Sequence, residues 1–276
     1  SNLIMYYDAN NVQLSTKVDE INTEDVAAKY EAWGWKVVTI DGNDTAQIRT
    51  ALHEARKEKE QPTLIIGKTV MGKGAVGPDG ETFEDKVSTH GQPLSAAGCD
   101  FLATVANLGG NPSNPFAIFP ESKELYELSA SRLREWSEEK KGVEEAWRKE
   151  NPELAAKLDM FLSGQLPELD YSKVTVPANG ATRATSAAVL SLYGEHVENM
   201  IVASADLSNS DKTDGYLKKT KALEKGDFSG KFFQAGVAEF TMTCIMNGMA
   251  LHGGVIPACG TFFVFSDYMK PAVRLS

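Results

Sequence analysis

The 276-residue chain is long enough for two domains of ordinary size, and its 42% hydrophobic and 24% charged residues are typical of a globular protein. Its formal net charge of −10 disfavours a nucleic-acid partner, because phosphate backbones select basic faces. No apolar run approaches the ~20 residues that span a bilayer, and the three scattered cysteines suit neither a disulfide framework nor a zinc site. We therefore expect a cytoplasmic protein without membrane or nucleic-acid partners.

The first 119 residues alternate apolar runs of strand length with stretches of helical spacing. The apolar runs lie at 3–7, 36–40 and 63–66. Apolar residues recur at helical spacing within 26–33 and 48–55, and Asn22 is the expected cap of the first helix. This order predicts an α/β unit with a parallel sheet, whose ligands bind near the carboxyl ends of the strands.

Residues 120–177 differ in character, because charged helix formers dominate them. Trp136, Val143 and Trp147 give only an intermittent apolar stripe. The pattern is typical of a solvent-facing helical linker, and a partner-binding helix is the alternative.

A second α/β unit is expected over 178–276. Helical spacing covers 181–193 and 239–251, and short apolar strands lie at 200–203 and 255–258. The chain opens without a methionine, two residues before an apolar run. A natural chain rarely begins inside a strand, because an unanchored strand leaves backbone N–H and C=O groups unpaired. We therefore expect a fragment that is truncated at both ends.

Two polar segments of the first unit are candidates for chemistry. Asp8-Ala9-Asn10-Asn11-Val12 follows the first strand, and an amide side chain plus a backbone carbonyl two residues on could ligate a hard cation. His90 lies in a loop after the third strand, where an imidazole could move protons or bind a sugar hydroxyl. The alternatives are an ordinary asparagine turn and an incidental loop histidine.

The second unit offers two acids and an aromatic group. Asp206 follows a strand, where its charge could face a cationic ring or simply stabilise a turn. Glu239 begins a long apolar helix. There its negative charge could interact favourably with the helix dipole, or its carboxyl group could share a proton with a ring nitrogen. Aromatic residues that could stack on a planar heterocycle, or fill a core, are Phe262, Phe265 and Tyr268.

The order of several segments resembles the transketolase family over essentially the whole chain. The segments that carry the resemblance are Asp8–Val12, Val87–Leu94, Ser163–Pro167, Ala181–Arg183, Ser204–Leu207, Met246–Gly248 and Gly260–Phe262. The resemblance implies the end of a diphosphate-binding domain (1–119), a helical linker (120–177) and the start of a pyrimidine-binding domain (178–276).

The resemblance also implies a cofactor, thiamine diphosphate, and a divalent metal, Mg²⁺ or else Ca²⁺ or Mn²⁺. By this resemblance the Asn10 side chain and the Val12 carbonyl ligate the metal. His90 contacts the diphosphate, the thiazolium ring and the substrate. Glu239 activates the cofactor by protonating its pyrimidine ring. Further cofactor contacts are implied for Asp206, Leu207, Phe262, Phe265 and Tyr268.

The implied reaction is the transfer of a two-carbon ketol unit from a ketose phosphate to an aldose phosphate, in the pentose phosphate pathway. Arg183 and Ser210 occupy positions that hold the substrate phosphate in the family. The resemblance further implies a homodimer with its site at the subunit interface, so that the fragment alone is expected to be inactive.

Two departures from the family pattern leave other functions open. Ala238 and Phe240 stand where the family usually has Arg and His, and the loop between Met71 and His90 is longer than usual. Related enzymes, 1-deoxyxylulose-5-phosphate synthase and dihydroxyacetone synthase, are the first alternative. A non-catalytic subunit or scaffold is the second.

Overall fold

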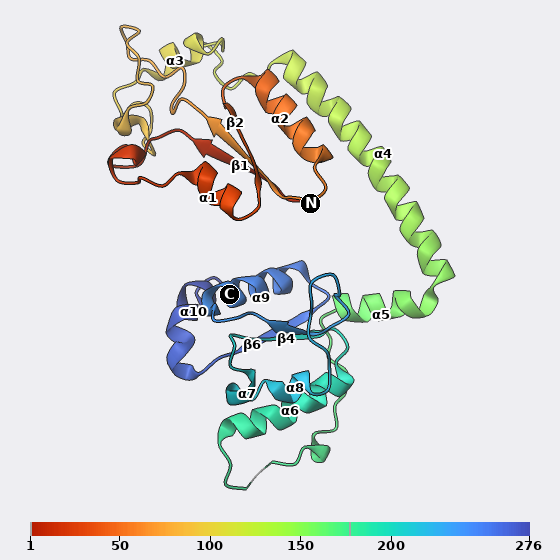
Figure 1. Ribbon diagram of the computed structural model, residues 1–276. Coiled ribbons are helices and arrows are strands. Elements are labelled where there is room, and N and C mark those ends of the chain that lie inside the picture. The colour runs from red at the N-terminus through yellow and green to blue at the C-terminus, as the bar shows by residue number, and fades with distance from the viewer. Residues whose placement is uncertain (1, 177) are drawn as a thin grey trace. The chain divides into compact units, whose positions relative to one another are not determined.

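The computed structural model describes residues 2–176 and 178–276. It comprises two compact units, one ending at Ala130 and the other beginning at Ser131 (Figure 1). Each unit holds its own three-stranded parallel sheet, so the expected fold class, two α/β units with parallel sheets, is confirmed. None of the described helices is long and apolar enough to cross a membrane.

The sheet of the first unit consists, in spatial order, of β1 (Ile4–Ala9), β3 (Thr63–Lys68) and β2 (Lys36–Asp41). The connecting helices are α1 (Val26–Ala32) and α2 (Thr45–Lys57). Leu64 and Ile65 of the central strand are fully buried, and Ala51 and Ala55 of α2 pack against Ile65. Because the strands are parallel, the segments that follow them emerge at one edge of the sheet.

The cap of α1 differs from the expectation. Asp25 is the N-cap residue, and its carboxylate accepts a hydrogen bond from the Ala28 amide at 2.9 Å. The prediction of Asn22 as the cap was wrong, because its side-chain oxygen accepts from the Glu24 amide at 3.0 Å in a turn that precedes the helix. Both residue types suit either position, and the spacing of apolar residues alone could not choose between them.

The chain after β3 folds into a small lobe with its own apolar centre. A β-bridge joins Val76 to Thr82, and Ala75, Phe83 and Cys99 form a buried cluster. The short elements of this region are η2 (Val87–Thr89) and α3 (Phe101–Asn107). The long loop before His90 is therefore an ordered, packed segment.

The expected linker forms two helices, followed by a short helical turn. These elements are α4 (Pro120–Glu150), α5 (Pro152–Leu162) and η3 (Tyr171–Lys173). Pro152 explains the break, because proline lacks the amide that would continue the helix but suits a first turn. No residue of α4 is buried, in keeping with its charged composition. Residue 177, the expected end of the linker, lies outside the described residues.

The sheet of the second unit consists, in spatial order, of β5 (Phe232–Gln234), β4 (Met200–Ser204) and β6 (Ile256–Gly260). The helical elements of this unit are α6 (Thr182–His196), α7 (Ser208–Asp211), α8 (Asp214–Leu217), α9 (Glu239–His252), η4 (Phe263–Phe265) and α10 (Ser266–Val273). Val202, Tyr216 and Phe232 share one buried cluster. Met242 and Met246 of α9 belong to another.

Tyr216 is expected to make stability fall at high pH. Burial raises the pKa of Tyr216 to about 12, and its hydroxyl donates to the Met200 carbonyl at 2.6 Å. A folded-state pKa above the unfolded value of 10.0 gives stabilisation that is complete below pH 10 and is lost as the pH rises through 12. In urea unfolding, Tyr216→Phe should therefore be less stable than the wild type at pH 8, with a difference that shrinks toward pH 12. A difference that stays constant with pH would contradict this account.

Candidate functional site

The carboxyl edge of the first sheet gathers polar side chains from several strand ends. Thr69, just after β3, donates to the Asp8 carboxylate at the end of β1. Asn43, after β2, accepts from the Val70 amide at 2.8 Å. These bonds fix the loops at the edge where a parallel sheet binds its ligands.

Asn10 and Val12 form a tight, ordered turn at this edge. The Asn10 side-chain oxygen accepts from the Val12 amide at 3.0 Å, and Asn11 adopts a left-handed backbone with φ 59°. The Asn11 carbonyl accepts from the Val18 amide at 3.0 Å, which ties the turn to the chain beyond it. An amide oxygen has a second lone pair, so Asn10 retains capacity to bind a cation.

The donor set of this turn suits a hard cation and no softer metal. It offers an amide oxygen and a backbone carbonyl, which are ligand types that Mg²⁺ and Ca²⁺ accept. Among the described residues, no group of three or more His, Cys, Asp or Glu side chains could hold a metal. Any divalent cation here would therefore need further oxygen ligands, such as those of a diphosphate.

The His90 loop lies against the chain that follows the Asn10 turn. Gly91 has φ 70°, and a methyl group added there would lie 2.9 Å from Leu14 Cδ2. Lys17 donates to the Asp85 carbonyl and joins the same two segments. His90 Nδ1 is buried without a hydrogen-bond partner, which is rare for a polar atom in a folded protein. The structure thus brings together the two candidate segments of the first unit.

Glu239 of the second unit opens onto a cavity of about 610 Å³. The cavity is lined by Ala205, Asp206, Leu207, Val237, Ala238, Glu239, Phe240, Thr241, Phe265 and Tyr268. Glu239 is only 7% exposed, and its Oε1 accepts from the Thr261 hydroxyl at 3.5 Å. Its backbone carbonyl accepts from the Thr243 hydroxyl at 2.8 Å. A buried carboxyl group without a cationic partner among the described residues can serve as a proton donor or acceptor for a bound heterocycle.

Asp206 lies on the same cavity in an unusual backbone conformation. Its φ is 62°, in the left-handed region that costs energy for a residue with a side chain. The side chain is exposed and has no hydrogen-bond partner among the described residues. Such strained residues cluster at binding sites, where the surrounding structure holds them in place.

The aromatic residues form a continuous stack. The rings of Phe262 and Phe265 lie 6.1 Å apart at 20°, and those of Phe265 and Tyr268 lie 6.3 Å apart at 24°. Phe265 and Tyr268 line the Glu239 cavity, whereas Phe262 lines a neighbouring one. A planar ring in the Glu239 cavity would find two aromatic side chains and a carboxyl group among the lining residues.

Arg183 lines this neighbouring cavity, of about 460 Å³, with a more polar wall. The other lining residues are Thr182, Ser186, Leu190, Val202, Asp211, Thr213, Ala258, Cys259, Gly260, Thr261, Phe262 and Phe263. The Arg183 side chain is exposed and makes no hydrogen bond or ion pair among the described residues. Ser210 does not line either cavity, and its hydroxyl donates to Asn209 Oδ1 at 3.0 Å. A free guanidinium in a polar cavity suits an anionic group such as a phosphate.

Sequence reasoning missed the polar residues that support these cavities. Thr261 contacts Glu239, while Asp211 and Thr213 line the Arg183 cavity. For Asp211 and Thr213 the local signal was the run of small polar residues after β4, which is equally typical of a loop. Thr261 lies in the Gly260–Phe262 segment but was given no role of its own.

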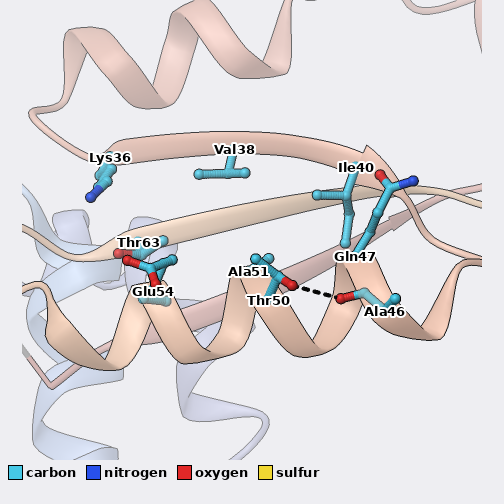
Figure 2. A pocket seen from close by; sticks show the side chains of 10 residues that line it. Lys36, Val38, Ile40, Ala46, Gln47, Thr50, Ala51, Glu54 and Thr63 are labelled. Carbon is cyan, nitrogen blue, oxygen red and sulfur yellow. Dashed lines mark hydrogen bonds between the residues drawn. The ribbon is translucent and has the colours of Figure 1, made fainter.

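A hollow of about 500 Å³ between β2 and α2 holds none of the predicted site residues. Figure 2 shows Val38 and Ile40 of β2 facing Ala51 of α2 across it. Thr50 donates to the Ala46 carbonyl at 2.9 Å and so satisfies its hydroxyl within the helix. Lys36, Glu54 and Thr63 lie at one end of this hollow and Gln47 at the other, and the wall between them is apolar (Figure 2).

Two protein-family models match the chain. Residues 1–167 match the transketolase thiamine diphosphate binding domain, and residues 179–276 match the transketolase pyrimidine binding domain. The two units are thus of the α/β class through which thiamine-diphosphate enzymes hold their cofactor. More narrowly, the chain belongs to the transketolase family.

Individual relatives agree with this assignment. The chain is 35% identical to a transketolase of Bacillus subtilis over 99% of its own length and 40% of the relative's. A transketolase structure from Leishmania mexicana matches 99% of the chain and 40% of its own, with 25% identity and a TM-score of 0.86. A transketolase structure from Pichia stipitis in complex with sedoheptulose 7-phosphate matches 99% of the chain and 41% of its own length, with 32% identity and a TM-score of 0.83. The chain therefore spans about two fifths of the length of these relatives, and the resemblance inferred from its sequence is confirmed.

Proposed function

We propose that the chain is part of a transketolase, a thiamine-diphosphate-dependent enzyme that transfers a two-carbon ketol unit from a ketose phosphate to an aldose phosphate. The observation that carries the proposal is the buried Glu239, which faces a cavity with Phe265 and Tyr268 in the unit that matches the pyrimidine-binding domain. Thiamine diphosphate, when bound, supplies the electron sink that allows the carbon–carbon bond beside a ketose carbonyl to break.

In this proposal the first unit holds the charged end of the cofactor. The diphosphate domain covers 1–119, the linker 120–177 and the pyrimidine domain 178–276. Asn10 Oδ1 and the Val12 carbonyl bind Mg²⁺, or Ca²⁺ or Mn²⁺ in its place, because both are oxygen donors in a fixed turn. His90 contributes an imidazole that hydrogen-bonds the diphosphate and the sugar substrate.

The second unit acts on the pyrimidine ring and on the substrate phosphate. Glu239 holds a proton at the ring nitrogen, and Thr261 orients its carboxyl group. The proposal assigns contacts with the cofactor to Asp206, Leu207, Phe262, Phe265 and Tyr268. Arg183 and Ser210 bind the phosphate of the sugar. Two copies of the protein form a homodimer, and each active site lies at the interface between the subunits.

The test uses the intact protein that contains this chain. With Mg²⁺ it should bind thiamine diphosphate in a fluorescence titration and convert xylulose 5-phosphate and ribose 5-phosphate into new sugar phosphates. Binding of the cofactor without ketol transfer would favour one of the related enzymes. Absence of both would favour a scaffold and overturn the proposal.

Replacing Asn10 by alanine should weaken metal-dependent binding of the cofactor. Loss of one oxygen ligand should raise the Mg²⁺ concentration for half-maximal thiamine diphosphate binding by about tenfold or more. Asn10→Asp keeps an oxygen donor and should restore most of the affinity. Asn43→Ala is the matched control, since it also removes an asparagine that accepts from a backbone amide at the same sheet edge. If Asn10→Ala and Asn43→Ala weaken cofactor binding equally, the effect comes from lost turn hydrogen bonds, and Asn10 is not a metal ligand.

A further inference from the structure

Asp211 joins the end of β4 to the loop that follows it. The Ser204 hydroxyl donates to Asp211 Oδ2 at 2.9 Å. The Thr213 amide and hydroxyl both donate to Asp211 Oδ1 at 2.8 Å. Ser204 is fully buried and Thr213 nearly so, so both carboxylate oxygens are engaged with firmly placed partners. Hydrogen bonds to a charged acceptor are the stronger class, and here three of them meet on one side chain.

The loop that Asp211 closes carries two residues of the Glu239 cavity. Asp206 and Leu207 lie between the anchors Ser204 and Asp211, and both line that cavity. The Ser204 hydroxyl also accepts from the Leu207 amide at 3.3 Å. The amide of Asp211 in turn donates to the Leu207 carbonyl at 2.8 Å. Leu207 is therefore held from both sides by the Ser204–Asp211 pair.

Asp206 itself cannot stabilise its own conformation. Its φ of 62° is unfavourable, and its side chain has no hydrogen-bond partner in the described part of the chain. The conformation must therefore be imposed by neighbours that do not move. Ala205 before it is buried, and Leu207 after it is tied to Ser204.

We propose that Asp211 is a positioning residue that holds Asp206 and Leu207 in the geometry required by the cofactor cavity. This inference rests on the proposed function, because the geometry matters only if that cavity binds the pyrimidine end of thiamine diphosphate. Asp211 also lines the Arg183 cavity. The same side chain therefore forms part of the wall of the Arg183 cavity and holds the loop that lines the Glu239 cavity.

A matched control exists in the same unit. Asp227 accepts from the Ser229 amide at 3.0 Å and from the Ser229 hydroxyl at 2.6 Å, in the same aspartate turn that Asp211 makes with Thr213. Asp227 also pairs with Lys221, and it lines neither cavity. Removing Asp227 thus removes an equivalent turn without touching the Asp206 loop.

The test measures cofactor affinity and loop protection in the intact protein. Asp211→Ala should weaken thiamine diphosphate binding about tenfold at saturating Mg²⁺ and speed hydrogen exchange at the Leu207 amide in the cofactor-free protein. Asp211→Asn, whose amide oxygen still accepts from Thr213, should recover most of both losses. Asp227→Ala should leave both readouts at the wild-type level.

Other outcomes decide against the proposal. Wild-type affinity and exchange in a folded Asp211→Ala protein would overturn it, as would an equal loss of affinity in Asp227→Ala. If Asp211→Ala does not fold, Thr213→Ala removes the hydroxyl that donates to Asp211 without touching the Leu207 amide, and it must show the same two effects in weaker form. If the wild type fails to bind thiamine diphosphate, the proposed function fails and this inference about the cofactor fails with it. Faster Leu207 exchange in the variant would then show only that Asp211 holds the loop.

Discussion

Glu239→Gln is expected to lower the rate of ketol transfer by about 10²- to 10⁴-fold, the range typical of losing a general acid–base group. Glutamine has nearly the same shape and can still accept from Thr261, so the cavity should keep its form. It cannot exchange a proton with a ring nitrogen at neutral pH, which is the role proposed for this residue. The measurement is steady-state turnover of xylulose 5-phosphate and ribose 5-phosphate at saturating cofactor.

Two comparisons separate this role from a structural one. Glu224→Gln changes an exposed glutamate of the same unit and should leave turnover unaltered. Cofactor affinity and thermal unfolding of Glu239→Gln should stay close to the wild type, because the substitution changes neither volume nor burial. Unchanged turnover with cofactor bound would remove Glu239 from the reaction. Loss of cofactor binding would instead give it a binding role.

The sequence was sufficient to predict the α/β architecture and the edge of the sheet at which ligands bind. Alternating strands and helices force parallel pairing, and parallel pairing places the ends of β1 and β3 at one edge of the sheet. The Asn10 turn and the His90 loop each follow one of these strands. Their contact through Leu14 and Gly91 also depends on how the long segment between β3 and His90 folds, which the residue pattern does not give.

Other features depended on three-dimensional detail that no local pattern carries. Asp211 binds Ser204 because the loop between them turns back on the strand end, and that path includes the left-handed Asp206. A positive φ at aspartate has no clear sequence signature, unlike the same conformation at glycine. Likewise, Phe262 and Phe265 are close in sequence and stacked, yet they line different cavities.

The long loop before His90 also needed the structure. The sequence predicted that this loop is longer than in the family pattern and predicted no fold for it. The structure gives it a buried cluster of Ala75, Phe83 and Cys99. The Thr89 hydroxyl, beside His90, donates to the Phe83 carbonyl at 2.9 Å. This segment is thus part of what fixes the His90 loop.

Arg183→Ala is expected to raise the KM for a phosphorylated ketose by about 10- to 100-fold while changing kcat little. Each hydrogen bond between charged groups contributes roughly 1.5–3 kcal/mol, and a phosphate that loses the guanidinium loses at least one of them. The phosphate lies away from the reacting carbons, so its loss of binding energy is the same in the ground state and in the transition state. Such a loss raises KM and leaves kcat nearly unchanged. Arg183→Lys retains the charge without the planar fork and should give an intermediate KM.

The decisive control for Arg183 is a substrate without a phosphate. An unphosphorylated ketose has nothing for the guanidinium to bind, so its kcat/KM should be the same in the wild type and in Arg183→Ala. Arg148→Ala, which removes a partly buried arginine paired with Glu144 and Asp159, should leave both substrates unaffected. If Arg183→Ala lowers kcat/KM equally for both kinds of ketose, the arginine supports the fold of its cavity and the phosphate must bind elsewhere. A selective loss would instead locate the phosphate in the cavity that Arg183 lines, beside the wall formed by Thr261 and Phe262.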